Sequence, residues 1–121
     1  MSDIGRSGPS AHVPLSELSL LVLLSLGGGP AHGYAMGQQV EERSGGRLNP
    51  TTGALYQALK RLRDQGLLEP DPEETRAADD ARRRYFRLTP LGREVVALEV
   101  ARLDRLVGLA RAHDLYPTSS S

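Results

Sequence analysis

The chain has 121 residues, with 15 basic and 15 acidic side chains, so its formal net charge is zero. That balance excludes uniform basicity as a basis for nucleic-acid binding but allows a local basic patch. The length predicts one domain, and the absence of cysteine excludes disulfides, thiolate catalysis, zinc fingers and iron–sulfur clusters.

The N-terminal quarter predicts a flexible arm followed by a buried helix. Residues 1–13 mix Gly, Ser and Pro without periodicity, which is typical of an arm. The next segment, residues 14–26, is apolar almost all round, and Gly27 to Pro30 ends it. Its apolar run is shorter than the ~18–20 residues of a membrane span, and no signal-peptide pattern flanks it. We therefore expect a cytoplasmic protein.

Two further helices are expected, over residues 33–43 and from Pro50 to Gly66. Thr51 and Thr52 supply capping hydroxyls to the second of these, and Gly66 suits the left-handed residue that ends a helix. Its apolar positions recur at i, i+3, i+4 and i+7 and define one face, formed by Leu55, Ala58, Leu59 and Leu62. The opposite face is polar and partly cationic, with Gly53, Tyr56, Gln57, Lys60, Arg63 and Asp64.

Two short β segments, residues 67–69 and 83–88, predict a hairpin with Phe86 and Leu88 on one face. The segment between them, Pro70 to Arg82, reads as a long loop. Between Pro70 and Ala81, Arg76 is the single basic residue against five acidic ones, namely Asp71, Glu73, Glu74, Asp79 and Asp80. Three arginines follow at its base, Arg82, Arg83 and Arg84.

The last helix begins at Thr89-Pro90 and extends to residue 113, before a disordered tail over residues 114–121. Apolar residues line a seam with alternating spacings of four and three, and others widen it. This breadth favours a homodimer interface made by Leu91, Val95, Val96, Leu98, Val100, Leu103, Leu106, Val107 and Ala110. The alternative is that both stripes pack on the first helix of the same chain.

Three helices, a hairpin and a further helix describe a mainly α fold with a small β-hairpin. This order predicts a winged helix-turn-helix over residues 14–88, followed by a dimerisation helix over residues 89–113. In that fold the third helix enters the major groove of DNA. Its N-terminus with Thr51 and Thr52 can contact phosphate or a base edge, and Tyr56 offers a hydroxyl to phosphate. Lys60 lies one turn further on.

The segments GGGPAHGYAMGQQVEERSGG, LNPTTGALYQALKRLRDQGLL and RRRYFRLTPLGR together resemble the PadR family of bacterial transcription regulators, in its subclass with a single short terminal helix. The resemblance runs from about Leu18 to Arg93. It implies a homodimeric repressor that binds double-stranded DNA, often relieved by a small hydrophobic or phenolic effector. It places the DNA-facing positions on Tyr34, Thr51, Thr52, Tyr56, Lys60, Arg83 and Arg84.

Two departures from the family pattern concern DNA contact. Gln57 stands where members often have proline, and it can hydrogen-bond an adenine edge or remain a solvated helix residue. The acidic loop cannot lie against phosphate. Either it points away from DNA, or the wing makes contact only through the arginines at its base.

Each candidate residue also has a structural interpretation. Tyr34 and Tyr56 can be half-buried aromatics with locally satisfied hydroxyls, and Lys60 can belong to a solvated face. The arginines can pair with Asp79 and Asp80, although exposed pairs contribute only ~0.2–1 kcal/mol.

An enzyme is not expected, because the three histidines lack metal spacing and no nucleophile or phosphate-loop motif occurs. We expect no metal and no cofactor. His32 is interpreted as a packing residue at a helix start. The remaining alternative function is a small-molecule- or protein-binding winged-helix dimer with weak or no DNA binding.

Overall fold

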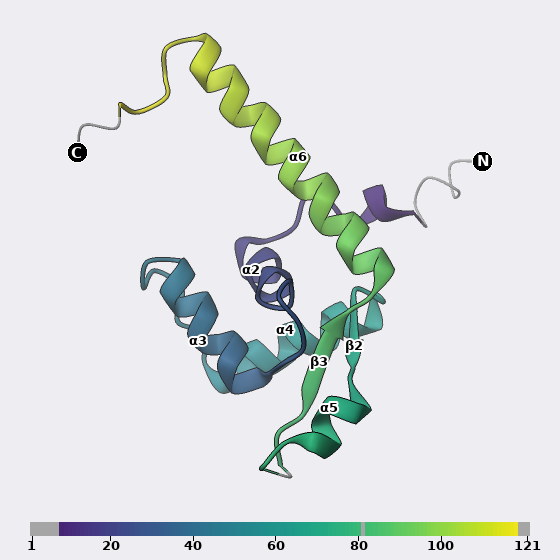
Figure 1. Ribbon diagram of the computed structural model, residues 1–121. Helices are drawn as coiled ribbons and strands as arrows, with labels where there is room; N and C mark the ends of the chain where they lie inside the picture. The colour runs from purple at the N-terminus through teal and green to yellow at the C-terminus, as the bar shows by residue number, and fades with distance from the viewer. Residues whose placement is uncertain (1–7, 81, 119–121) are drawn as a thin grey trace.

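The computed structural model of the chain describes residues 8–80 and 82–118. Helices surround a small antiparallel sheet of three strands in the order β1-β3-β2 (Figure 1). The elements are η1 (Pro9–His12), α2 (Glu17–Ser25), β1 (Ala31–His32), α3 (Gly33–Arg43), α4 (Thr52–Asp64), β2 (Leu68–Pro70), α5 (Pro72–Ala77), β3 (Tyr85–Leu88) and α6 (Pro90–Ala112). This order confirms the predicted winged helix-turn-helix with a terminal helix. Within the described residues, no helix has both the length and the apolar character needed to cross a membrane.

The predicted apolar face of the third helix is confirmed in α4. Its four buried residues are Leu55, Ala58, Leu59 and Leu62. Thr51 caps the helix by accepting a hydrogen bond from the Ala54 amide at 3.1 Å. Gly66 has the predicted left-handed backbone, with φ of 80°. The buried face packs into one core with Val22, Leu23, Met36 and Val40 from α2 and α3.

Two elements differ from the sequence prediction. The two-residue strand β1 was not predicted, and it pairs Ala31 with Phe86 and His32 with Tyr85. Because β1 turns into α3 immediately after His32, the pairing goes no further, and β3 begins at Tyr85 rather than at residue 83.

The acidic segment is not a loop throughout, since part of it forms α5. Asp71 caps this helix by accepting from the Glu74 amide at 3.0 Å, and Pro72 occupies its first turn. Thr75 accepts a hydrogen bond from the Tyr85 amide at 3.0 Å. These contacts hold α5 against β3, near the lower end of the hairpin in Figure 1.

The junction between the hairpin and α6 is tightly built. The Thr89 hydroxyl donates to the Gly66 carbonyl at 2.6 Å and accepts from the Gly92 amide at 2.9 Å. Gly92 is buried against the backbone of Leu67, so closely that a Cβ at this position would collide with the Leu67 carbonyl. The start of α6 is therefore fixed to the segment that leaves α4.

The apolar residues of α6 separate into two groups. Val95 is completely buried in the core of its own chain, and Leu91 and Val96 pack against that core. Val95 therefore packs within its own chain, whereas Leu91 and Val96 are half-buried, and their place in a dimer interface stays a prediction. The remaining large apolar residues form an exposed set, the apolar strip of α6: Leu98, Val100, Leu103, Leu106, Val107 and Leu109. Ala110 lies half-buried beside it.

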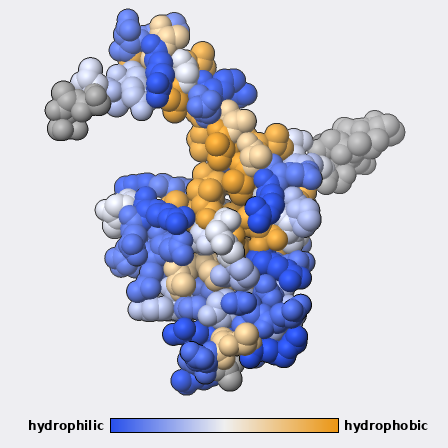
Figure 2. Space-filling view, in the orientation of Figure 1, coloured by the Kyte–Doolittle hydropathy of each residue, from blue (hydrophilic) through white to orange (hydrophobic). Residues whose placement is uncertain are grey.

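Beyond the core, α6 extends away from the rest of the chain (Figure 1). Figure 2 shows an apolar band where α6 crosses over α2 and continues upward. Leu24 on α2 is also exposed, by 37% of its surface, so α2 is less completely buried than its composition predicts.

Glu99 is buried on α6 and joins the N-terminal segment to this helix. It accepts two hydrogen bonds of 2.8 Å from Arg102 and one of 3.1 Å from the Leu15 amide. The Arg102 hydrogen bonds lower the pKa of Glu99, so its carboxylate is charged at neutral pH.

Described residues near both ends of the chain make defined contacts. Of the segment predicted to be an arm, residues 9–12 form η1, which packs against α6. Past the end of α6, the Leu115 amide donates to the Ala110 carbonyl at 2.8 Å, and the Arg111 guanidinium lies 4.1 Å from the Tyr116 ring centroid. Residues 1–7 of the arm, residues 119–121 of the tail and Ala81 of the acidic segment lie outside the described residues.

We predict that Gly92→Ala lowers the free energy of unfolding by about 2–3 kcal/mol, because the new methyl group must displace the Leu67 backbone. Urea unfolding followed by circular dichroism measures this. Gly53→Ala is the control, because a Cβ there meets no atom within 4 Å. The control should be neutral or stabilising by up to ~1 kcal/mol. Equal stabilities for the two variants would contradict the role assigned to Gly92.

Candidate nucleic-acid interface

His32 caps the start of α3, as its interpretation as a helix-start residue predicts. Its Nδ1 accepts a hydrogen bond from the Ala35 amide at 3.3 Å. Its ring stacks parallel to Tyr34 at 6.5 Å and meets Tyr85 edge-on at 5.2 Å. Burial lowers the pKa of His32, Arg83 lowers it further, and Asp80 opposes both. The imidazole is therefore neutral at pH 7, as its role as an acceptor requires.

Tyr56 reaches from α4 to the start of α3. Its hydroxyl lies against Gly33, where any Cβ would collide with it. Tyr56 is 46% exposed and Tyr34 is 69% exposed, so both rings remain accessible. The Tyr34 hydroxyl accepts a hydrogen bond from Gln38 at 3.2 Å. A local partner therefore exists for Tyr34, as the structural interpretation requires, although the ring itself is largely exposed.

A hollow of about 250 Å³ lies between the starts of α3 and β3. We call it the arginine hollow, and it is lined by His32, Gly33, Tyr34, Tyr56, Asp80, Arg82, Arg83 and Arg84. Four of the eight predicted DNA-contacting residues meet here, from three separate parts of the chain: Tyr34, Tyr56, Arg83 and Arg84.

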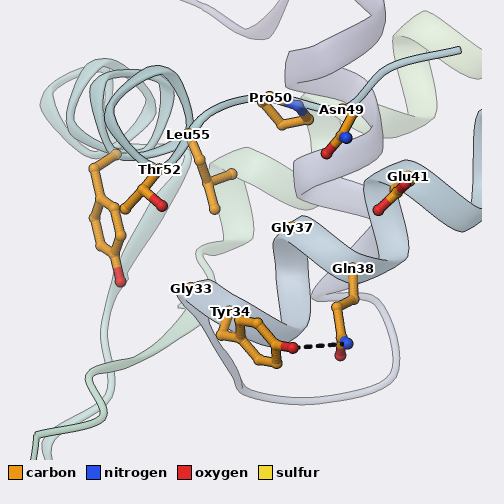
Figure 3. A pocket seen from close by; sticks show the side chains of 10 residues that line it. Gly33, Tyr34, Gly37, Gln38, Glu41, Asn49, Pro50, Thr52 and Leu55 are labelled. Atoms are coloured by element: carbon orange, nitrogen blue, oxygen red, sulfur yellow. Dashed lines mark hydrogen bonds between the residues drawn. The ribbon is translucent and has the colours of Figure 1, made fainter. Parts of the chain in front are cut away.

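A second hollow, of about 320 Å³, lies between α3 and α4 and shares Tyr34 and Tyr56 with the first. Figure 3 shows Tyr34 and Gln38 along one side, with Thr52 and Asn49 on the segments opposite. Thr52 thus opens onto the same region as the tyrosines. Thr51 is exposed and serves as the N-cap of α4.

Gln57 and Lys60 lie on the exposed face of α4, outside both hollows. They line a separate shallow groove with Arg61, Asp64 and Gln65. Lys60 donates to Asp64 at 2.9 Å, and this hydrogen bond lowers the pKa of Asp64. Both side chains are exposed, so the pair is weak and phosphate can displace it.

The arginines near the wing have different partners. Arg87 pairs with Glu69 at 2.8 Å and Asp71 at 3.8 Å, and Arg82 pairs with Asp80 at 3.5 Å. Over residues 8–80 and 82–118, Arg83 and Arg84 form no salt bridge, and both are exposed. The predicted pairing of the arginines with Asp79 or Asp80 is thus found at Arg82, with Asp80. Arg83 and Arg84 remain accessible.

Several residues of this surface were not predicted from the sequence. Gln38 had a signal, since it follows Tyr34 by four positions on a helix. Asn49 precedes the proline that begins the α4 cap. Arg63 joins Tyr56, Lys60 and Phe86 around a small groove, which depends on how the hairpin packs on α4. Asp80 was considered from the sequence as a pairing partner of the arginines, but not as part of the site that the arginine hollow forms. Within the part of the chain that the structure describes, no cluster of metal-ligating side chains is present.

A model of the transcriptional regulator PadR-like family matches residues 20–98. An uncharacterized 37.1 kDa protein in transposon Tn4556 of Streptomyces fradiae is 42% identical over 93 residues, which cover 77% of this chain. The chain spans only 25% of the length of that curated relative.

Solved structures share the fold. A PadR family transcription regulator from Clostridium difficile R20291 superposes with a TM-score of 0.66 at 22% identity, covering 81% of this chain and 98% of that one. ZitR of Lactococcus lactis, solved in complex with DNA, gives a TM-score of 0.55 at 18% identity, covering 83% of this chain and 60% of that one.

We predict a pH dependence of stability that arises from His32. Its folded-state pKa lies below the ordinary 6.5, so between the two values the unfolded chain binds more protons. Stability therefore rises with pH through this window, and the contribution is lost as pH falls through the folded-state pKa. Urea unfolding between about pH 5 and pH 7.5 measures the effect.

His32→Asn is the matched variant, because asparagine can still cap α3 but does not titrate. The difference in pH dependence between the two proteins isolates His32 from the other histidines. Parallel stability curves for wild type and variant would show that His32 contributes nothing.

Proposed function

Because the chain belongs to the transcriptional regulator PadR-like family, we propose that it is a sequence-specific DNA-binding regulator that acts in the cytoplasm as a homodimeric repressor. A small hydrophobic or phenolic effector that relieves repression is part of the proposal. The DNA-contacting set comprises Tyr34, Thr51, Thr52, Tyr56, Gln57, Lys60, Arg83 and Arg84.

The arginine hollow is the observation that carries this function. Two accessible guanidinium groups, Arg83 and Arg84, lie beside the exposed tyrosines Tyr34 and Tyr56. Guanidinium groups bind phosphate through paired hydrogen bonds, and tyrosine hydroxyls donate to phosphate oxygens. A backbone phosphate held in this hollow would position the exposed face of α4 beside the adjacent groove.

Base reading is then assigned to α4. Thr51 caps its N-terminus, and Thr52 lines the hollow between α3 and α4, which shares Tyr34 and Tyr56 with the arginine hollow. Gln57 and Lys60 follow along the exposed face. Gln57 suits an adenine edge, and Lys60 suits guanine or phosphate.

The apolar strip of α6 supports dimerisation. Its members are between 37% and 55% exposed, on a helix that extends past the core of its own chain. Contiguous apolar surface of this kind is typical of an interface. A two-fold dimer predicts a palindromic operator with half-sites ~34 Å, or a multiple, apart. Apolar side chains between the two copies would form the effector site.

We predict that the protein binds a duplex from its own promoter with an affinity that falls steeply with salt. Lys60→Ala should lower the slope of log affinity against log salt by about 0.9 per contact, hence by about two in a dimer. Fluorescence anisotropy titrations at several salt concentrations measure this. Arg93→Ala is the control, because Arg93 lies in the first turn of α6, at the end of β3 remote from the arginine hollow. Absence of salt-dependent binding to any fragment would favour the winged-helix dimer without DNA affinity.

We predict that Leu103→Asp dissociates the dimer, because it places a charge in the middle of the apolar strip. Light scattering at micromolar concentration should give the mass of one chain for this variant and of two chains for wild type. Leu115→Asp makes the same chemical change at a residue that is 74% exposed beyond α6, and it should leave the dimer intact. A monomeric wild type would refute the assembly.

A further inference from the structure

Asp80 is the one acidic side chain among the described residues that line the arginine hollow. It shares this lining with Arg82, Arg83 and Arg84. A carboxylate therefore lies where the proposed function requires phosphate to bind. The other carboxylates near the wing differ, since Glu69 and Asp71 pair with Arg87 instead.

The backbone holds Asp80 in this position. Its side-chain oxygen Oδ1 accepts from the Arg82 amide at 2.9 Å, and its carbonyl accepts from the Arg83 amide at 3.0 Å. Its carboxylate also lies 3.5 Å from the Arg82 guanidinium. Asp80 is half-buried, whereas its neighbour Asp79 is exposed and lies outside the hollow.

The charge of Asp80 acts on the groups around it. It opposes the lowering of the His32 pKa by Arg83. A carboxylate presents the same kind of acceptor as a phosphate oxygen and weakens the positive potential that attracts phosphate. An incoming phosphate must displace this carboxylate from Arg82 or bind beside it against repulsion.

We propose that Asp80 is a built-in competitor of DNA phosphate that suppresses sequence-independent binding. The inference rests on the proposed function and deepens it. Non-specific affinity comes almost entirely from phosphate contacts, whereas specific affinity also includes base contacts. A carboxylate in the hollow therefore weakens binding to random DNA and leaves the base contacts of α4 in place. Because random DNA offers no base contacts to compensate, Asp80 keeps the affinity for random DNA low.

The test compares Asp80→Asn with Asp79→Asn, using a short mixed-sequence duplex as the probe. Asparagine keeps the oxygen that accepts from the Arg82 amide, so the turn is retained while the charge is removed. At about 50 mM salt, Asp80→Asn should bind the duplex roughly threefold to tenfold more tightly than wild type, with a smaller gain at about 200 mM. Asp79→Asn should change the affinity less than twofold. Asp80→Ser, with a shorter neutral acceptor, should reproduce the gain.

The outcomes separate this inference from the proposed function. If wild type binds with salt dependence but Asp80→Asn binds the duplex no more tightly than Asp79→Asn, the inference is overturned. The proposed DNA binding then remains. If neither wild type nor Asp80→Asn binds any duplex, the proposed function fails and the inference fails with it. A gain in Asp80→Asn alone supports both.

Discussion

The contact of Gly92 with the Leu67 backbone is the constraint on which the arrangement of the chain depends. Leu67 leaves α4 and enters the hairpin, while Gly92 lies in the first turn of α6. Thr89 joins the same point through its bond to Gly66. Helix α4, the β2-β3 hairpin and α6 therefore meet at one close-packed junction. Their relative orientations follow from it.

The zero net charge conceals a division of charge along the chain. Residues 67–81 carry a net −5 and residues 82–88 a net +4. The structure divides the acidic segment further. Asp71 and Glu69 both pair with Arg87, whose single positive charge balances one of their two negative charges, whereas Asp80 lies in the arginine hollow. The structure thus separates Asp80 from the other acidic residues of this segment by its surroundings.

Local patterns in the sequence predicted the local structure well. The apolar face of α4 and the left-handed Gly66 follow from spacing and from backbone preference, which neighbouring residues determine. Signals for α5 were also present, since Asp71 followed by Pro72 is a typical helix start, but the acidic composition favoured a loop.

Features that depend on distant residues could not be predicted in the same way. Strand β1 has two residues and exists because β3 lies beside it. The arginine hollow requires α3, α4 and the wing to be placed together, so its lining was predicted in pieces, with Tyr34 and Arg83 assigned separately. The separation of α6 into a buried start and an exposed apolar strip likewise depends on where the core ends. The apolar spacing is alike around the buried Val95 and around the exposed Leu103, so it does not distinguish the two parts.

Because α6 is long, a small change of its angle at the junction moves its far end by a large distance. A helix of 23 residues is about 35 Å long, so a turn of about 10° at its base moves its far end about 6 Å. This exceeds the ~3.4 Å rise of one base pair. In the proposed dimer, α6 would act as a lever arm and convert small angular changes into changes in operator spacing. The close contact that Gly92 allows at the base of α6 would therefore limit how far the angle of α6 can vary in the dimer.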